Sequence, residues 1–384
     1  MSVSVLSDTA IRADDNTMLA SFELSQKSWV ITLRLPGSEK MSRHTVKPGD
    51  IAGAADLFSR QRAKAERQTG QAPRVVTIYE AGLDGFWLHR WLCEQGVESH
   101  VVDAASIAAP RRKRNAKSDG IDGEALLRTL AAWRRGEPRV CSMVAPPTPE
   151  EEDRRRVGRE RARLLEERIA ITNRIRGLLL SQGVTGYNPL TRDRHTRLEE
   201  LRTGDGRAPP ERLRAEISRM LARLEVLLVQ IRQVEAERDA LLEAAAAEAT
   251  APIAMLLTLC GIGPEIAGGL GLECFCRHFA NRRKLGSFVG LAPTPWRSGG
   301  IQREQGISKA GRPELRKLMI EAAWLWLKYQ PDSALARWFH ARVGDRRGRE
   351  KRINIVALAR KLVVALWRFV TDGVVPEGAR LKAA

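Results

Sequence analysis

Short apolar runs rich in β-forming residues alternate with helical patterns over the first third of the chain. The runs predict strands, and the helical patterns end at glycine residues. Hairpins join antiparallel neighbours and crossovers join parallel ones, so this order predicts an α/β domain with a mixed sheet between helices. The predicted strands are 18–24, 29–35, 41–46, 74–79 and 97–102, and the predicted helices are 51–69, 86–94 and 119–135. We assign residues 18–142 to this domain and residues 1–17 to a flexible polar leader.

A proline-rich joint at 143–149 precedes a long, densely charged helical region, which we place at 150–247. Apolar residues recur there at alternating spacings of three and four, typical of two long helices packed against each other. The pattern consists of Leu164 or Leu165, Ile169 and Ile175 upstream and Leu221, Leu224, Leu228 and Ile231 downstream. The turn-rich stretch 183–210 between them predicts irregular structure. We therefore expect an antiparallel coiled-coil arm that serves dimerisation or spacing.

The C-terminal region, 252–384, predicts a mostly α-helical domain with helices at 313–328 and 352–371. Near its start, Leu256 to Leu270 predicts a helix that Gly261-Ile262-Gly263-Pro264 interrupts. This spacing is compatible with a helix-hairpin-helix, whose backbone N–H groups bind a DNA phosphate, and also with an ordinary glycine-capped turn.

The net charge of the chain narrows the classes of function that it can have. The 384 residues hold 64 Lys and Arg against 46 Asp and Glu, a net charge of +18, with an apolar content of 43% that a disordered basic tail would not have. The N-terminus lacks the apolar core of a signal peptide, and no stretch predicts a membrane span. Five cysteines without a Cys-x-x-Cys pair favour a reducing cytoplasm. We therefore expect a cytoplasmic protein that binds nucleic acid and no membrane.

Four carboxylates of the first domain occupy positions that suit metal-dependent chemistry. Glu23 lies in the first strand, Glu80 follows the central strand, and Asp119 and Asp122 share one face at the start of a helix. Neighbouring strands and a returning helix can bring all four together, and crowded carboxylates require hard cations such as Mg²⁺ or Mn²⁺. Two such ions stabilise the attacking and leaving oxygens of a phosphodiester. Taken singly, the two aspartates would instead be helix-capping residues.

Two further groups of residues are weaker candidates, for a metal site and for nucleic-acid binding. The Cys-x-Cys spacing near His278 is atypical for zinc, so Cys260, Cys274 and Cys276 are interpreted as buried thiols. A basic run precedes the acidic helix and is expected to bind nucleic acid: Arg111, Arg112, Lys113, Arg114 and Lys117.

Three motifs of the first domain resemble the DEDD transposases of the insertion-sequence-110 family and their Piv/MooV-type invertase relatives. They are Tyr79-Glu80-Ala81-Gly82 with Gly85-Phe86, Ser99-His100-Val101-Val102, and Lys117-Ser118-Asp119 with Asp122. The resemblance implies a ribonuclease H-like fold similar to the resolvase RuvC. It implies that Glu80, Asp119 and Asp122 are the second, third and fourth catalytic, metal-binding acids. Glu23 takes the place of the family's usual first aspartate, and its extra methylene places the ion differently or through water.

The resemblance continues in the C-terminal domain, the family's transposase-20 domain. Its motifs are Gly290-Leu291-Ala292-Pro293, Ser298-Gly299-Gly300, Gly306-Ile307-Ser308-Lys309 with Gly311, and Leu315-Arg316. The serine before the glycine pair is the family's proposed nucleophile, so the resemblance assigns that role to Ser298, with Ser308 as the substitute. A serine attacking a phosphodiester needs positive charge beside it. The residues expected to supply charge or bind phosphate are Arg297, Arg303, Lys309, Arg312 and Arg316.

From about residue 18 to the end, the resemblance implies a DNA transposase of a bacterial insertion sequence, associated with the nucleoid. Metal-dependent strand cleavage and exchange would proceed on double-stranded donor and target DNA through a serine-linked intermediate in a composite site between protomers of a dimer or tetramer. A structured bridge RNA would select the sites. Two alternatives remain at this point: a junction resolvase-like nuclease that uses only the four acids and water, and a non-catalytic nucleic-acid-binding protein.

Overall fold

The computed structural model describes residues 16–82, 85–107, 119–246, 252–298 and 301–382. The chain divides into two compact units, 1–147 and 148–384. The boundary between them falls within the proline-rich joint at 143–149. None of the helices in the described ranges combines the length and the hydropathy that crossing a lipid bilayer requires.

The first unit is a six-stranded mixed sheet in the order β3-β2-β1-β4-β5-β6. Its strands are β1 (Thr17–Leu24), β2 (Trp29–Arg34), β3 (Met41–Val46), β4 (Arg74–Glu80), β5 (Glu98–Val102) and β6 (Met143–Val144). β1, β4 and β5 are parallel, whereas β2 is antiparallel to both of its neighbours. The five predicted strands are confirmed within a residue or so at each end. β6, a two-residue strand antiparallel to β5, lies where only a joint was predicted.

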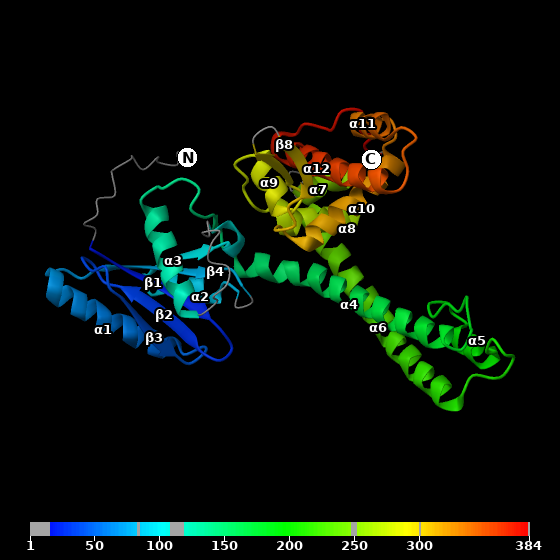
Figure 1. The fold of residues 1–384 in the computed structure, drawn as a ribbon, viewed down its shortest axis with the longest axis horizontal. Helices are drawn as coiled ribbons and strands as arrows, with labels where there is room; N and C mark the ends of the chain where they lie inside the picture. The colour runs from blue at the N-terminus through cyan, green and yellow to red at the C-terminus, as the bar shows by residue number, and fades with distance from the viewer. Residues whose placement is uncertain (1–15, 83–84, 108–118, 247–251, 299–300, 383–384) are drawn as a thin grey trace. The chain divides into compact units, whose positions relative to one another are not determined.

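Helices cover both faces of this sheet (Figure 1). α1 (Ile51–Thr69) and α2 (Trp87–Glu94) pack on the face to which Met18, Ala20 and Phe22 of β1 contribute. α3 (Asp119–Arg134) packs its leucines on the other face, against Leu19 of β1 and against Val76 and Ile78 of β4. A short 3-10 helix, η1 (Ala104–Ser106), follows β5. The alternation of side chains along each strand thus assigns odd positions of β1 and even positions of β4 to the α3 face.

The second unit begins with two long helices that lie side by side, α4 (Pro149–Leu180) and α6 (Glu211–Ala246) (Figure 1). α4 starts with a capping box, in which the Thr148 side chain accepts a hydrogen bond from the Glu151 amide. Arg161, nearer the start of α4, pairs with Glu235, nearer the end of α6, whereas Arg174, later in α4, pairs with Glu216, early in α6. The two helices are therefore antiparallel, as predicted. The buried stripe of α6 follows the predicted three-four spacing and contains Ile217, Leu221, Leu224, Leu227, Ile231 and Val234.

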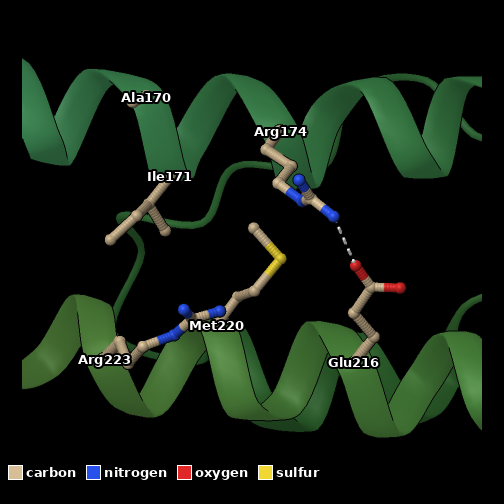
Figure 2. A pocket seen from close by; sticks show the side chains of 6 residues that line it. All are labelled: Ala170, Ile171, Arg174, Glu216, Met220 and Arg223. Atoms are coloured by element: carbon tan, nitrogen blue, oxygen red, sulfur yellow. Dashed lines mark hydrogen bonds and ion pairs between the residues drawn. The ribbon is translucent and has the colours of Figure 1, made fainter.

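Three details of this arm differ from the prediction: Ile169 of the expected apolar pattern is exposed, Leu227 rather than Leu228 is buried, and the connection between the helices is not wholly irregular. The connection expected to be irregular contains a short helix, α5 (Arg194–Glu200), whose Leu198 joins the apolar cluster of the arm. A groove of about 330 Å³ lies between α4 and α6, with the Met220 side chain beside the Arg174–Glu216 pair (Figure 2). It is lined by Ala170, Ile171, Arg174, Glu216, Met220 and Arg223.

The remainder of the second unit is mostly helical, as predicted, with one two-stranded hairpin. It contains α7 (Pro252–Leu257), α8 (Pro264–Leu270), the π-helical η2 (Gly271–Phe275), α9 (Arg282–Phe288), β7 (Pro293–Ser298), β8 (Ile301–Ile307), α10 (Pro313–Tyr329), α11 (Ala334–Val343) and α12 (Arg349–Asp372). α10 and α12 confirm the two predicted helices, whereas α9, α11 and the hairpin were not foreseen. One apolar cluster, centred on Trp326, Leu358 and Leu362, joins these elements.

Candidate functional site

Two carboxylates stand at the carboxyl ends of the neighbouring parallel strands β1 and β4. The strand register pairs Phe22 with Tyr79, and one further step along both strands places Glu23 beside Glu80. By the alternation described above, both side chains belong to the face that α3 covers. Glu23 is partly buried and Glu80, the last residue of its strand, is exposed. The prediction that the strands of Glu23 and Glu80 are neighbours is confirmed.

α3 approaches this edge of the sheet closely at Gly123. The buried Ser21 hydroxyl donates a hydrogen bond to the Gly123 carbonyl at 2.9 Å. A Cβ atom at Gly123 would contact the Thr32 hydroxyl and lie 3.2 Å from Glu23 Oε1. Farther along, Arg43 of β3 pairs with Glu124 at 2.8 Å, and this hydrogen bond holds the pKa of Glu124 below its ordinary value. A side chain larger than hydrogen would therefore move α3 away from Glu23.

The two aspartates of α3 lie at its N-terminal end. Asp122 is partly exposed and directly precedes Gly123, while Asp119 is the first residue of the helix and its side chain lies outside the description. Among the described side chains, no group of three or more His, Cys, Asp or Glu lies close enough together to hold a metal ion. The basic run from Arg111 to Lys117 also falls outside the described residues. The structure thus brings α3 close to Glu23 at the end of the sheet where Glu80 also lies.

Ser298 occupies the tip of the β7–β8 hairpin. It pairs with Ile301 across a two-residue Gly-Gly connection, and Arg297 pairs with Gln302 one step earlier. Arg303 on β8 is the partner of Trp296. The side chains of Ser298, Arg297 and Arg303 lie outside the description.

The base of this hairpin is packed backbone against backbone. A Cβ atom at Gly311 would overlap the Gly290 nitrogen and the carbonyl oxygens of Ser287 and Phe288. The Ser308 amide donates to Ala292 O at 2.6 Å and the Arg312 amide to Phe288 O at 2.9 Å. These contacts fix both strands of the hairpin to the start of α10.

The cations predicted to bind phosphate next to the hairpin differ in their surroundings. Lys309 is exposed, and its carbonyl accepts a hydrogen bond from Arg316 Nη1 at 3.3 Å. Arg312 forms an ion pair with Glu273 of η2, which Arg159 of α4 also binds through two hydrogen bonds of 2.8 and 3.1 Å. Burial would raise the pKa of Glu273, but the Arg159 hydrogen bonds and the Arg312 charge outweigh it and lower the pKa. Arg312 therefore links the hairpin to the arm.

This Glu273 network was not predicted from the sequence. Its partners are separated by 114 and 39 positions, and no local pattern joins them. Arg155, buried on α4, adds a hydrogen bond to the Leu272 carbonyl at 2.9 Å, so two arginines of one helix face contact η2.

The cysteine interpretation holds only in part. Cys274 is buried, which raises the pKa of its thiol, whereas Cys260 is partly buried and Cys276 is exposed. Cys276 Sγ still donates to the Leu272 carbonyl at 3.0 Å. As noted above, no metal-binding group occurs among the described side chains.

The glycine-rich segment of the suspected helix-hairpin-helix connects α7 to α8. Gly261 has a φ of +83° and packs on the Tyr329 side chain of α10, where a Cβ atom would lie 2.9 Å from Tyr329 Cβ. Gln330 donates to the Cys260 carbonyl at 2.8 Å, which fixes the same turn. These contacts explain the glycine structurally, and phosphate binding by this turn stays a prediction.

Comparison with known proteins gives a consistent result. A family model described as "Transposase IS116/IS110/IS902 family" matches residues 253–337. The chain is 56% identical to the "Putative transposase y4rJ" of Sinorhizobium fredii over 97% of both chains. It is also similar to the transposase for insertion sequence element IS1328 of Yersinia enterocolitica, at 26% identity over 79% of this chain and 86% of the relative. A similar match, at 27% identity over 77% of both chains, is the transposase for insertion sequence element IS1111A of Coxiella burnetii.

Proposed function

Because the chain belongs to the IS116/IS110/IS902 family of insertion-sequence transposases, we propose that it cuts and rejoins DNA with two sets of residues. The acids Glu23, Glu80, Asp119 and Asp122 form the metal-dependent set, and Ser298 is the nucleophile. The observation that carries the first set is the placement of Glu23 and Glu80 on adjacent strand ends, on the sheet face that α3 covers.

The carboxylates suit a hard divalent cation, Mg²⁺ or Mn²⁺. Mg²⁺ keeps several waters and takes one or two protein carboxylates together with substrate phosphates, so it does not require three preassembled side chains. Glu23 and Glu80 would hold it from the sheet, and Asp119 and Asp122 from α3. Bound there, it would neutralise the phosphate and polarise it for attack. Gly123 and Ser21 set the distance between the two pairs of acids.

Ser298 would supply the covalent step. Its Oγ attacks the phosphorus of a DNA strand, an O–P ester forms, and the deoxyribose oxygen leaves and takes up a proton as the hydroxyl loses one. Gly299 and Gly300 follow Ser298 in the sequence, and their lack of side chains would let a phosphate approach the backbone closely. Lys309, Arg316 and the paired Arg312, together with Arg297 and Arg303, would surround the charged phosphate.

Three finer proposals accompany this mechanism. The strand order, with β2 alone reversed among the first five strands, supports a ribonuclease H-like, RuvC-like fold. The three-four spacing of the arm supports a coiled coil that takes part in a dimer or tetramer. The net charge of +18 supports binding of both double-stranded DNA and a structured bridge RNA that selects the sites in the nucleoid.

Labelled DNA on denaturing gels, with and without protease treatment, tests the serine step. Wild-type protein should leave a protease-sensitive covalent adduct, and Ser298→Ala should lose both adduct and cleavage. Ser308→Ala is the matched control and should retain them. An adduct that survives in Ser298→Ala but disappears in Ser308→Ala would transfer the role to Ser308.

The same gels address the alternative of a water-using nuclease. If Ser298→Ala still cuts while Glu80→Gln does not, water is the nucleophile and the covalent proposal fails. If cleavage persists in Glu80→Gln and in Asp122→Asn, the acids only stabilise the fold. Sequencing of RNA that copurifies with the protein tests the guide, since a discrete transcript from the element's own flank is expected.

A further inference from the structure

Three exposed cations on α11 and α12 rest against tryptophan rings. Lys361 Nζ lies 4.7 Å from the centre of the Trp338 ring, and Arg342 Cζ lies 5.9 Å from the same centre. Lys351 Nζ lies 5.5 Å from the centre of the Trp324 ring on α10. Rings hold a cation by their negative faces and so restrict the rotamers of long side chains. We call Arg342, Lys351 and Lys361 the ring-backed cations.

The ring-backed cations are not neutralised by carboxylates. Within the described ranges no ion pair joins any of them to Asp or Glu, whereas three other arginines of the same region are paired. The paired ones are Arg337 with Glu377, Arg368 with Asp372, and Arg380 with Asp332. The rings thus position positive charge that the protein itself leaves available to a polyanion.

Arg342 is also held by a buried polar residue. Its Nε donates to Asn354 Oδ1 at 2.9 Å, and the Asn354 amide donates to the Glu350 carbonyl at 3.0 Å. Asn354 is only 7% exposed. A buried amide that fixes an exposed guanidinium aims the charge in one direction, as a binding surface requires.

The stretch from the end of α11 to the start of α12 adds further positive charge to this surface. From 342 to 352 it carries six basic residues against two acidic ones. On α12, Lys351 and Lys361 are ten residues apart, which is roughly 15 Å along the axis with about 80° of rotation between them. At 3.4 Å per base pair, that spacing extends over roughly four base pairs of one duplex.

We infer that this surface of α10, α11 and α12 binds the phosphate backbone of duplex DNA. The inference builds on the proposed DNA-processing function and names a surface for its substrate. Duplex DNA is favoured over an unpaired strand because the cations cover the ring faces on which unpaired bases would stack. Contacts of this type read charge and shape and are insensitive to base sequence.

The salt dependence of duplex binding tests the inference. Each lost phosphate contact lowers the slope of log K against log salt by about 0.9. The triple variant Arg342→Gln, Lys351→Gln and Lys361→Gln should therefore lower it by about 2.7, with at least a tenfold loss of affinity near 0.1 M salt. The control triple, Arg337→Gln, Arg368→Gln and Arg380→Gln, removes the same charge from carboxylate-paired positions outside the 342–352 stretch. It should change the slope by less than about 1.

Equal losses in both triples would show an effect of net charge alone and overturn the inference. So would an unchanged slope in the first triple, or a loss confined to single-stranded DNA or RNA probes. Circular dichroism checks folding, and Lys361→Gln alone should still lower the slope by about 0.9 if the triple is unstable. Binding is measured without divalent metal, so failure of the cleavage proposal leaves this result unaffected, and the reverse also holds.

Discussion

Replacing Gly123 by alanine places a methyl group at the point where α3 packs on the sheet. The new Cβ would contact the Thr32 hydroxyl, lie 3.3 Å from Thr32 Cβ, and lie 3.2 Å from Glu23 Oε1. Thr32 is fully buried and β-branched, so it has little freedom to turn away. The Ser21 hydrogen bond to the Gly123 carbonyl resists a shift of the helix itself.

Two opposing terms set the size of the effect. Alanine is favoured over glycine inside a helix by about 0.8–1 kcal/mol. Overpacking of a tight interface costs about 1–3 kcal/mol. The variant should therefore be destabilised by roughly 0–2 kcal/mol at α3.

Gly158→Ala in α4 isolates the packing contribution. No atom lies within 4 Å of a Cβ atom at Gly158, so this variant keeps the propensity gain without the contact. The difference between the two variants should equal the overpacking cost of about 1–3 kcal/mol, or roughly 5- to 150-fold in the protection of helix amides.

Hydrogen exchange followed by mass spectrometry measures both helices in the full chain. Gly158→Ala should slow the exchange of α4 peptides. Gly123→Ala should slow the exchange of α3 peptides less than that, or should speed it up. If α3 gains as much protection as α4, the close approach of α3 to Glu23 is wrong. Cleavage adds a second measurement, since a displacement of about 1 Å at the acids should slow it by up to about 100-fold.

Three further outcomes follow from packed and charged residues. Glu273→Gln should lower the local stability of the first turns of α4 by about 1–3 kcal/mol at neutral pH, as measured by hydrogen exchange. The pKa of Glu273 is lower in the folded protein than in the unfolded chain, so its contribution to stability is present above the unfolded pKa and is lost as the pH falls through the folded pKa. The stabilities of the variant and the wild type should therefore converge on acidification. Leu224→Ala in the arm should lower its stability by about 2–5 kcal/mol by thermal melting, whereas Val226→Ala, 59% exposed, should change it by less than about 0.5 kcal/mol. Gly311→Ala should reduce cleavage while duplex affinity persists, because the methyl group displaces the base of the Ser298 hairpin; unchanged cleavage would contradict that packing.

Local periodicity was sufficient to locate most elements. Short apolar runs predicted β1, β2, β4 and β5, and the three-four spacing of apolar residues predicted the antiparallel helices of the arm. The hairpin of β7 and β8 was not predicted from the sequence. α11 was missed because Pro331 and the glycines at 344 and 348 fragment the surrounding pattern.

The arrangement of side chains from distant segments was decided only by the tertiary structure. The sequence placed Glu23 in the first strand and Glu80 directly after the central one, and the parallel register and the alternation of faces put both on the sheet face that α3 covers. Glu273 meets Arg159 across 114 positions, and Trp338 meets Lys361 across a helix-helix contact. Periodicity reports which face of an element is apolar, whereas the pairing of particular side chains depends on strand register and on how helices pack, which are set by the chain as a whole.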